Sequence, residues 1–167
     1  LITSVVFEAP SHVQTIGAQM FGGNSIRTLN IPASVTSIGD NAFGWQQTLT
    51  DIDTQTALTS VNFESGSNLT RLDGAAFMAN QSLTSITLPS SLVTLGSAVF
   101  DGDLNLSEIT FLGNEPALVT VGSPPASNTF RGLPSTARAN VAWNAIGFAV
   151  DGSGKWNGLT VVRGQDP

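Results

Sequence analysis

Short runs of alternating apolar and polar residues recur along this chain, and the clearest run lies in residues 83–100, LTSITLPSSLVTLGSAVF. Ile86 and Leu88 are separated by one polar residue, so their side chains share one face of a predicted strand. Pro89 follows and ends that strand, because proline cannot donate a hydrogen bond to a ladder. The pattern therefore predicts a short strand that is closed by a turn.

A second run, residues 92–95, predicts another short strand within the same unit. It is closed by Gly96, which we expect to permit a backbone turn that other residues resist. The unit ends at Phe100, a large apolar side chain. Two short strands and one buried phenyl ring thus describe one predicted coil.

The same order of residues recurs, with a phenylalanine five positions after an aliphatic residue at 21, 43, 77 and 100. The fifth copy starts at Val121 and reaches Phe130 after nine positions, which predicts a small insertion at 123–127. Spacings of 22 (21 to 43) and 23 (77 to 100) lie within the roughly 20–29 residues of leucine-rich repeats. One such unit cannot bury its apolar face alone, so stacked neighbours are expected to form a continuous core.

One region departs from this spacing. Residues 58–63 fit the strand motif better than residues 49–52, so we expect 44–57 to be an insertion between regular units. Insertions in repeat proteins map to loops on one face, which is often the binding face. The candidate binding residues here are Trp45, Gln46, Gln47, Asp51 and Asp53. Exposed tryptophans are enriched at binding hot spots, although packing of Trp45 onto the neighbouring coil is an equally good interpretation.

The polar positions of the predicted strands form two columns that face outward. One column is Ser4, Thr28, Ser60, Ser85 and Glu108, and the other is Val6, Asn30, Asn62, Thr87 and Thr110. Stacked strands hold such side chains about 4.8 Å apart in flat rows. These residues either fill solvent-facing sites of a sheet or form a shallow polar face for a protein or glycan. An ice-binding face is a remote alternative, because the rows mix Glu, Asn and Val.

The pattern changes after residue 133, so we divide the chain into repeats at 1–133, a C-terminal capping segment at 134–162 and the start of a linker at 163–167. An open end of a solenoid exposes strand edges and core, which is why a terminal cap is expected. The apolar residues expected to cover the last coil are Trp143, Phe148, Trp156 and Leu159.

Composition narrows the classes of function. The 167 residues are 41% hydrophobic and only 11% charged, with a net charge of −6. Nucleic acid is not an expected partner, because phosphate binding needs clustered Lys and Arg. Cysteine is absent, so neither disulfides nor thiolate metal sites are possible. No apolar run is long enough to span a membrane, so we expect no direct membrane insertion. No signal peptide is visible, and we interpret the chain as a fragment of a longer exported protein.

Candidate chemistry is sparse. His12 is the single histidine, and cysteine is absent, so the residues needed for a nucleophilic triad or a zinc site are missing. We expect His12 to be an ordinary surface residue. Residues 101–105, DGDLN, resemble the start of a calcium loop, but Leu106 and Leu112 stand where Gly and Glu are required. We expect a solvated turn there, no metal, no cofactor and no catalytic residue. Glu8, Glu64, Glu108 and Glu115 lie on strands or turns, and nothing favours a catalytic pair among them.

The segments SITLPSSLVTLGSAVF, TLNIPASVTSIGDNAF and SVNFESGSNLTRLDGAAF resemble the BspA-like leucine-rich repeats of bacterial and some protist surface proteins. This resemblance covers roughly residues 1–133. It implies a secreted or surface-attached protein, and several members of the family are adhesins that bind host matrix proteins or other cells.

The sequence therefore predicts a right-handed, mainly β repeat solenoid of about five coils with little helix. The predicted function is non-catalytic adhesion or protein binding at a bacterial cell surface, with a protein or glycan ligand on a host or neighbouring cell. The alternative is a structural spacer that displays another module. The fragment is expected to be monomeric.

Overall fold

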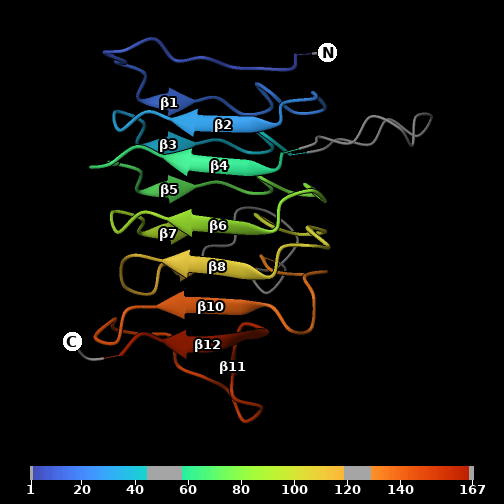
Figure 1. Cartoon of the computed structure of the whole chain (residues 1–167), viewed down its shortest axis with the longest axis vertical. Coiled ribbons are helices and arrows are strands. Elements are labelled where there is room, and N and C mark those ends of the chain that lie inside the picture. Colours follow the sequence, from blue (N-terminus) through green and yellow to red (C-terminus); the bar gives the residue numbers. More distant parts are fainter. Residues whose placement is uncertain (1, 45–57, 119–128, 166–167) are drawn as a thin grey trace.

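The computed structural model describes residues 2–44, 58–118 and 129–165, and within them the chain forms a stack of short strands (Figure 1). The longer strands are β2 (Thr28–Ile31), β4 (Ser60–Phe63), β6 (Ser85–Leu88), β8 (Glu108–Phe111), β10 (Arg138–Val141) and β12 (Leu159–Arg163). The two-residue strands are β1 (Thr15–Ile16), β3 (Ser37–Ile38), β5 (Arg71–Leu72), β7 (Thr94–Leu95), β9 (Ala117–Leu118) and β11 (Lys155–Trp156). The described residues contain no helix, and so none that could cross a membrane.

The strands build two walls of one spiral. Strands β2, β4, β6, β8, β10 and β12 stack along one side and form the long-strand wall, whereas β1, β3, β5, β7 and β9 form the short-strand wall. The strands of the two walls run in opposite directions, because each coil passes along one wall and returns along the other (Figure 1). Successive coils pair in parallel throughout the short-strand wall. In the long-strand wall they pair in parallel from β2 to β4 and from β6 through β8 and β10 to β12. The chain is thus a mainly β repeat solenoid, as the sequence predicts.

Period-two alternation explains which side chains fill the space between the walls. In β6 the side chains of Ile86 and Leu88 are buried, whereas those of Ser85 and Thr87 are exposed. The predicted strand at 58–63 is confirmed, since β4 pairs with β2 in register from Ser60 to Phe63. One continuous core of buried aliphatic and aromatic side chains therefore runs through the stack.

The repeated phenylalanines form a single file of stacked rings. From Phe21 to Phe43, Phe77, Phe100 and Phe130, successive ring centroids lie 5.3, 5.6, 6.0 and 6.1 Å apart, and the planes are tilted by no more than 11°. This phenylalanine file confirms the predicted spacing. It also includes Phe130, which follows the irregular spacing of the fifth copy. Offset-stacked rings at such distances add about 0.5–1.5 kcal/mol per pair to the burial of their area.

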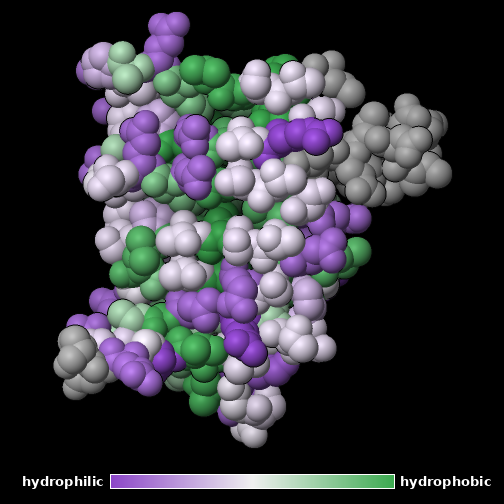
Figure 2. Space-filling view, in the orientation of Figure 1, coloured by the Kyte–Doolittle hydropathy of each residue, from purple (hydrophilic) through white to green (hydrophobic). Residues whose placement is uncertain are grey.

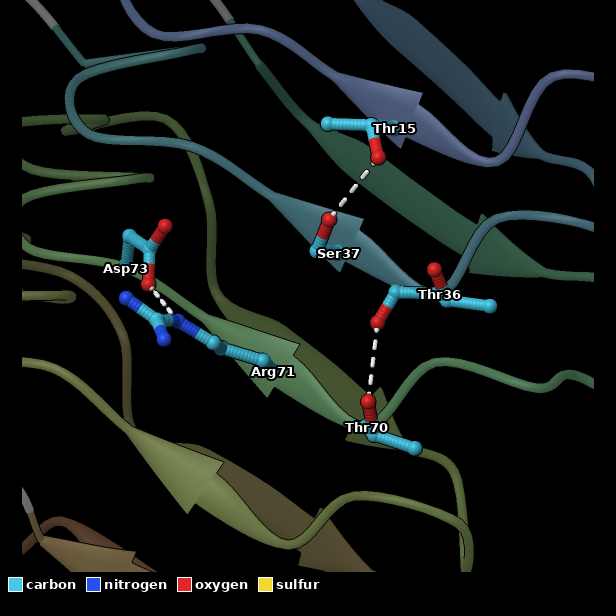
Figure 3. Close-up of polar contacts among 6 residues, drawn as sticks. All are labelled: Thr15, Thr36, Ser37, Thr70, Arg71 and Asp73. Carbon is cyan, nitrogen blue, oxygen red and sulfur yellow. Dashed lines mark hydrogen bonds and ion pairs between the residues drawn. The ribbon is translucent and has the colours of Figure 1, made fainter.

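Hydroxyl side chains link each coil to the coil before it, a role that the sequence analysis did not predict. Thr36 Oγ1 donates to the carbonyl of Gln14 (3.0 Å), and Thr70 Oγ1 donates to the carbonyl of Thr36 (3.1 Å). Figure 3 shows this second bond beside the contact between the hydroxyls of Thr15 and Ser37. Similar bonds are donated by the side chains of Ser34, Thr59, Asn68, Ser91, Asn105, Ser107 and Thr129. Part of the Ser, Thr and Asn content thus holds coils together.

The glycine that closes each short strand has a different role from the one expected. Neither Gly39 nor Gly96 has a positive φ, so no left-handed turn requires them. Instead, a Cβ on Gly96 would lie 2.6 Å from the backbone of Asp73 and Gly74, and one on Gly39 would lie 2.7 Å from the nitrogen of Ala18. Glycine is needed because the preceding coil passes too close for a side chain.

The C-terminal part of the described chain covers the end of the core. Phe148, Trp156 and Leu159 are buried, but Trp143 is 46% exposed, so the prediction that it covers the last coil is wrong. Glu115 holds this part in place, since its carboxylate oxygens accept from the indole N–H of Trp156 (2.7 Å) and the amide of Phe148 (2.6 Å). These bonds draw the segment back onto the turn after β8.

Candidate binding face

The predicted outward columns are brought together on the long-strand wall. Thr28 is paired with Ser60 and Asn30 with Asn62 across β2 and β4. Ser85 is paired with Glu108 and Thr87 with Thr110 across β6 and β8. These eight predicted residues therefore form two rows across one face, which we call the binding face. In Figure 2 this face is mostly pale, with hydrophilic side chains gathered in separate patches.

Both rows extend further than the sequence analysis placed them. Arg138 and Asn140 of β10 continue the rows from Glu108 and Thr110, and β12 adds Thr160 and Val162. The signal was present in the run RANV, whose second and fourth residues are buried like those of SITL and EITF. The sequence analysis places this run in the capping segment, because it lacks the phenylalanine and glycine of the repeat. The boundary at residue 133 stays a prediction.

The rows do not reach the first unit as expected. Residues 2–7 form no strand, so Ser4 and Val6 are not paired with Thr28 and Asn30. The side chain of Val6 is 82% exposed. A hydrogen bond from the amide of Ser25 to the carbonyl of Ile2 (2.9 Å) holds this segment beside the first coil.

Few charges interrupt the binding face, and its polar groups contact one another. The amide of Asn62 donates to Asn30 Oδ1 (3.1 Å), and the amide of Asn140 donates to Glu108 Oε2 (2.6 Å). The first contact joins residues of the same row on neighbouring strands, whereas the second crosses from one row to the other. The rows are therefore fixed by the sheet below and by their own side-chain bonds.

The long-strand wall is interrupted between β4 and β6. Strands β2 and β4 form one sheet, and β6, β8, β10, β12 and β11 form another. After β4, β8 and β12 the next residue donates to the coil before it, as Glu64 does to Ile31 (3.0 Å) and Leu112 does to Leu88 (3.1 Å). Pro89 occupies this position after β6 and has no N–H. The bond to the carbonyl of Phe63 therefore cannot form.

The turn after β4 adds to this separation. It is two residues longer than the turns of neighbouring coils, since nine positions separate Phe63 from Leu72 and seven separate Leu88 from Leu95. Both the amide and the side chain of Asn68 donate to the carbonyl of Ala33, and Glu64 Oε2 accepts from the amide of Ala33 (3.0 Å). These bonds hold the turn toward the coil before it and away from the coil after it.

A cleft of about 410 Å³ lies at this interruption. Four of the predicted binding residues line it: Ser60, Asn62, Ser85 and Thr87. Glu64 lies at the turn, while Pro89 and Leu112 supply apolar surface. Sequence reasoning found the side chains of this cleft but not the cleft itself, because Pro89 was considered only for ending its own strand.

The remaining predicted binding residues cannot be placed. Trp45, Gln46, Gln47, Asp51 and Asp53 lie outside the described residues, as does most of the predicted insertion at 44–57. The predicted insertion at 123–127 lies outside them too. Their role in binding stays a prediction.

The structure gives the acidic turn after Phe100 a structural role. Asp101 and Asp103 are buried, so the prediction of a solvated turn is wrong for both. Arg131 donates to both carboxylate oxygens of Asp101, and the amide of Asn80 donates to Asp103 Oδ1 (2.7 Å). Burial raises the pKa of the Asp103 carboxyl to about 8.

In the described part of the chain, no group of three or more His, Cys, Asp or Glu side chains is placed to hold a metal ion. His12 is exposed, as expected. Glu115 is occupied by its bonds to Phe148 and Trp156. Among the described residues, the feature best placed to contact another molecule is thus the binding face with its cleft.

Residues 54–122 match the model of the BspA type leucine rich repeat region with 6 copies. Residues 54–122 are therefore similar in sequence to BspA-type leucine-rich repeats. The resemblance seen in the sequence extends over residues 1–133, and the matched region lies within it.

A solved structure supports the same fold. The crystal structure of the pneumococcal vaccine antigen PcpA is 19% identical in sequence, with a TM-score of 0.56. The similarity covers 78% of this chain and 32% of that chain, so this chain spans about a third of the length of PcpA. At this identity the likeness concerns the fold alone. No curated protein matches the chain.

Proposed function

We propose that this chain is a non-catalytic binding scaffold exposed at a bacterial cell surface, and that its binding face contacts a protein or glycan on a host or neighbouring cell. The observation that carries the proposal is the binding face, where two registered rows of hydroxyl and amide side chains lie flat over consecutive coils. Repeat solenoids use such extended faces for binding. The pneumococcal antigen with the same fold supports the surface location.

A non-enzymatic role is supported by the chemistry of the described residues. Asp101, Asp103 and Glu115 are held by structural hydrogen bonds. The described rows otherwise supply Ser, Thr and Asn side chains, and their carboxylate, Glu108, accepts a hydrogen bond from Asn140 rather than from a hydroxyl. Such groups suit recognition by hydrogen bonds, whereas nucleophilic catalysis needs a nucleophile that is bonded to a base.

Binding to immobilised matrix proteins tests the proposal. Fibronectin, laminin and collagen serve as probes, and binding is measured by surface plasmon resonance with the purified chain. Thr87→Glu places a charge in the centre of the binding face and should weaken binding. Ala117→Glu is the matched control, because Ala117 is an exposed position of β9 on the short-strand wall.

If neither substitution changes the response, the long-strand wall is not the face that binds. If the unmodified chain binds none of the three proteins and no intact host cell, the binding scaffold fails as a function.

A structural spacer is the second candidate, and one observation favours it. The described N- and C-terminal ends lie at opposite ends of the stack (Figure 1). Bonds between coils follow the same axis along much of the described stack, so the unit can hold flanking segments at a fixed separation. A chain that binds nothing but keeps two fused fluorescent proteins at a constant separation in energy-transfer measurements would be such a spacer.

A further inference from the structure

We infer that the cleft between β4 and β6 is a saccharide subsite of the binding face. This inference deepens the proposed function and rests on the same face. It begins from the interruption of the wall, because two consecutive coils face each other there without a connecting ladder. The outward polar side chains of these two coils therefore border a cleft. Where neighbouring long strands are hydrogen-bonded, the same side chains lie side by side in closed rows.

The interruption involves both ends of the two strands. At the N-terminal end, Thr59 donates to the carbonyl of Arg27 (2.9 Å) and Ser107 donates to that of Thr84 (3.0 Å). The equivalent bond from Thr84 to the carbonyl of Thr59 is absent from the described backbone. At the C-terminal end, Pro89 has no N–H to donate. The cleft therefore has main-chain polar groups at both ends.

The short-strand wall limits what can enter. Strands β5 and β7 of the same two coils are paired in register from Arg71 with Thr94 to Leu72 with Leu95. An inserted peptide strand needs about 4.8 Å on each side of itself, and the intact ladder behind the cleft keeps the two coils adjacent. An additional strand does not fit, whereas a compact ligand held by side chains does. The volume of about 410 Å³ lies within the roughly 300–1,000 Å³ of small-molecule sites.

The side chains that line the cleft indicate which class of ligand it can bind. The hydroxyls of Ser60, Ser85 and Thr87 can each donate and accept hydrogen bonds, and Asn62 adds an amide. Among the residues that the structure describes, no Lys or Arg lines the cleft, which disfavours phosphate and sulfate groups. The one carboxylate in this described lining, Glu64, already accepts a hydrogen bond from Ala33. A neutral ligand with many hydroxyl groups matches these partners best.

The apolar part of the lining completes the match. Pro89 and Leu112 belong to successive coils and border the same cleft as the polar side chains. Sugar rings present C–H groups on one face and hydroxyls around the edge. A saccharide can therefore place its C–H face on Pro89 and Leu112 while its hydroxyls bond to the rows.

The test is a titration of the isotope-labelled chain followed by amide NMR spectra. N,N′-diacetylchitobiose, lactose and maltose are the probes, and glycerol at equal hydroxyl concentration is the control. We expect at least one saccharide to give saturable shifts at amides of residues 59–67, 84–88 and 90, with no such shifts from glycerol.

Two substitutions and one matched control identify the site. Ser85→Leu fills the cleft without touching the backbone and should weaken saccharide binding by about tenfold. Pro89→Ala supplies the missing N–H, should close the wall and should abolish the shifts. Thr28→Leu changes the same row on β2, outside the cleft, and should leave the shifts unchanged.

Absence of saturable shifts with all three saccharides overturns the inference, as do shifts that persist unchanged in Ser85→Leu. Retained binding to matrix proteins in that case leaves the proposed function standing and removes only the saccharide subsite. Loss of both kinds of binding removes the proposed function as well.

Discussion

The phenylalanine file and the long-strand wall pass through the same coils, but only one of them is continuous. The rings from Phe21 to Phe130 stack without a gap, with centroid separations of 5.3 to 6.1 Å. The long-strand wall is interrupted between β4 and β6, at the coil that ends its strand with Pro89. Ring stacking needs only an aromatic side chain at the right place in each coil, whereas a ladder needs backbone donors that face the neighbouring strand.

This difference separates two kinds of cohesion in the solenoid. The core continues through the interruption, since Val61 of β4 and Ile86 of β6 are both buried. The surface of the wall therefore opens at this level while the packing beneath it is retained. A repeat array can therefore gain a surface cleft where two coils lose their backbone pairing, because the packing of the core is kept.

Truncating the centre of the file should have the largest effect. Phe77 is fully buried between Phe43 and Phe100, so Phe77→Ala should lower the free energy of unfolding by about 3–5 kcal/mol. Urea denaturation followed by circular dichroism measures this loss. Phe21→Ala is the control and should cost less, because Phe21 is half-buried and stacks on Phe43 alone among the described rings. A loss below about 1 kcal/mol for Phe77→Ala would show that the file does not carry the core.

The second prediction concerns the buried acidic turn beside the file. Burial raises the pKa of Asp103 to about 8 in the folded chain, above its ordinary value of 3.8. Its contribution to stability should therefore be fully present below about pH 4 and decline toward about pH 8, by at most about 1.4 kcal/mol per pH unit. Asp103 Oδ2 and Asn80 Oδ1 have no partner among the described residues, and a proton on Oδ2 gives that oxygen a hydrogen to donate.

Asp103→Asn tests this assignment by denaturation between pH 3 and pH 9. The amide cannot ionise, so the variant should match the parent near pH 3 and exceed it by a few kcal/mol near pH 9. A parent chain whose stability rises between pH 4 and pH 8, relative to the variant, would contradict the neutral carboxyl.

The third prediction measures how closely the coils approach. Gly96→Ala should cost about 1–3 kcal/mol, because the new Cβ meets the backbone of Asp73 and Gly74 at 2.6 Å. Gly17→Ala is the matched control at the same position of the first described coil. There the nearest atom is the flexible end of Met20 at 3.3 Å, so the change in free energy should stay within about 0.5 kcal/mol. Equal costs at both positions would mean that glycine serves local backbone freedom.

The smallest effect is expected on the binding face. Asn62 is exposed and its amide contacts only Asn30 Oδ1, so Asn62→Ala should change the free energy of unfolding by no more than about 0.5 kcal/mol. Asn80→Ala is the comparison, because the buried Asn80 amide donates to the carbonyls of Phe43 and Phe77. That substitution should cost about 1–3 kcal/mol. Chemical denaturation of both variants under identical conditions measures the difference, and a larger loss for Asn62 would contradict it.

The sequence predicted the coil but not the cleft, and the reason is physical. Period-two alternation and the spacing of the phenylalanines depend on the chain itself, so β4, β6 and the phenylalanine file could be predicted. The cleft depends on whether the backbone N–H groups of one coil reach the carbonyls of the coil before it. Predicting this needs the alignment of Pro89 with Phe63. Pro89 is visible in the sequence, but the sequence does not show that it lies beside the carbonyl of Phe63.

Polar residues were harder to interpret than apolar ones for a similar reason. Thr36 and Thr70 point to carbonyls of the preceding coil, whereas Thr87 faces outward, and the three are alike in composition. The residues around Asp103 form no apolar pattern that would mark this aspartate as buried rather than solvated. A side chain that bonds across one repeat is distinguishable only when the positions of both coils are known.

The interruption beside Pro89 also has a mechanical consequence. At that level the long-strand wall carries no ladder, while β5 and β7 remain bonded on the opposite wall. The stack is therefore less stiff on one side there, and bending should concentrate at this joint with the short-strand wall as its hinge. A rod built from nearly equal coils thus acquires one preferred direction of flexure.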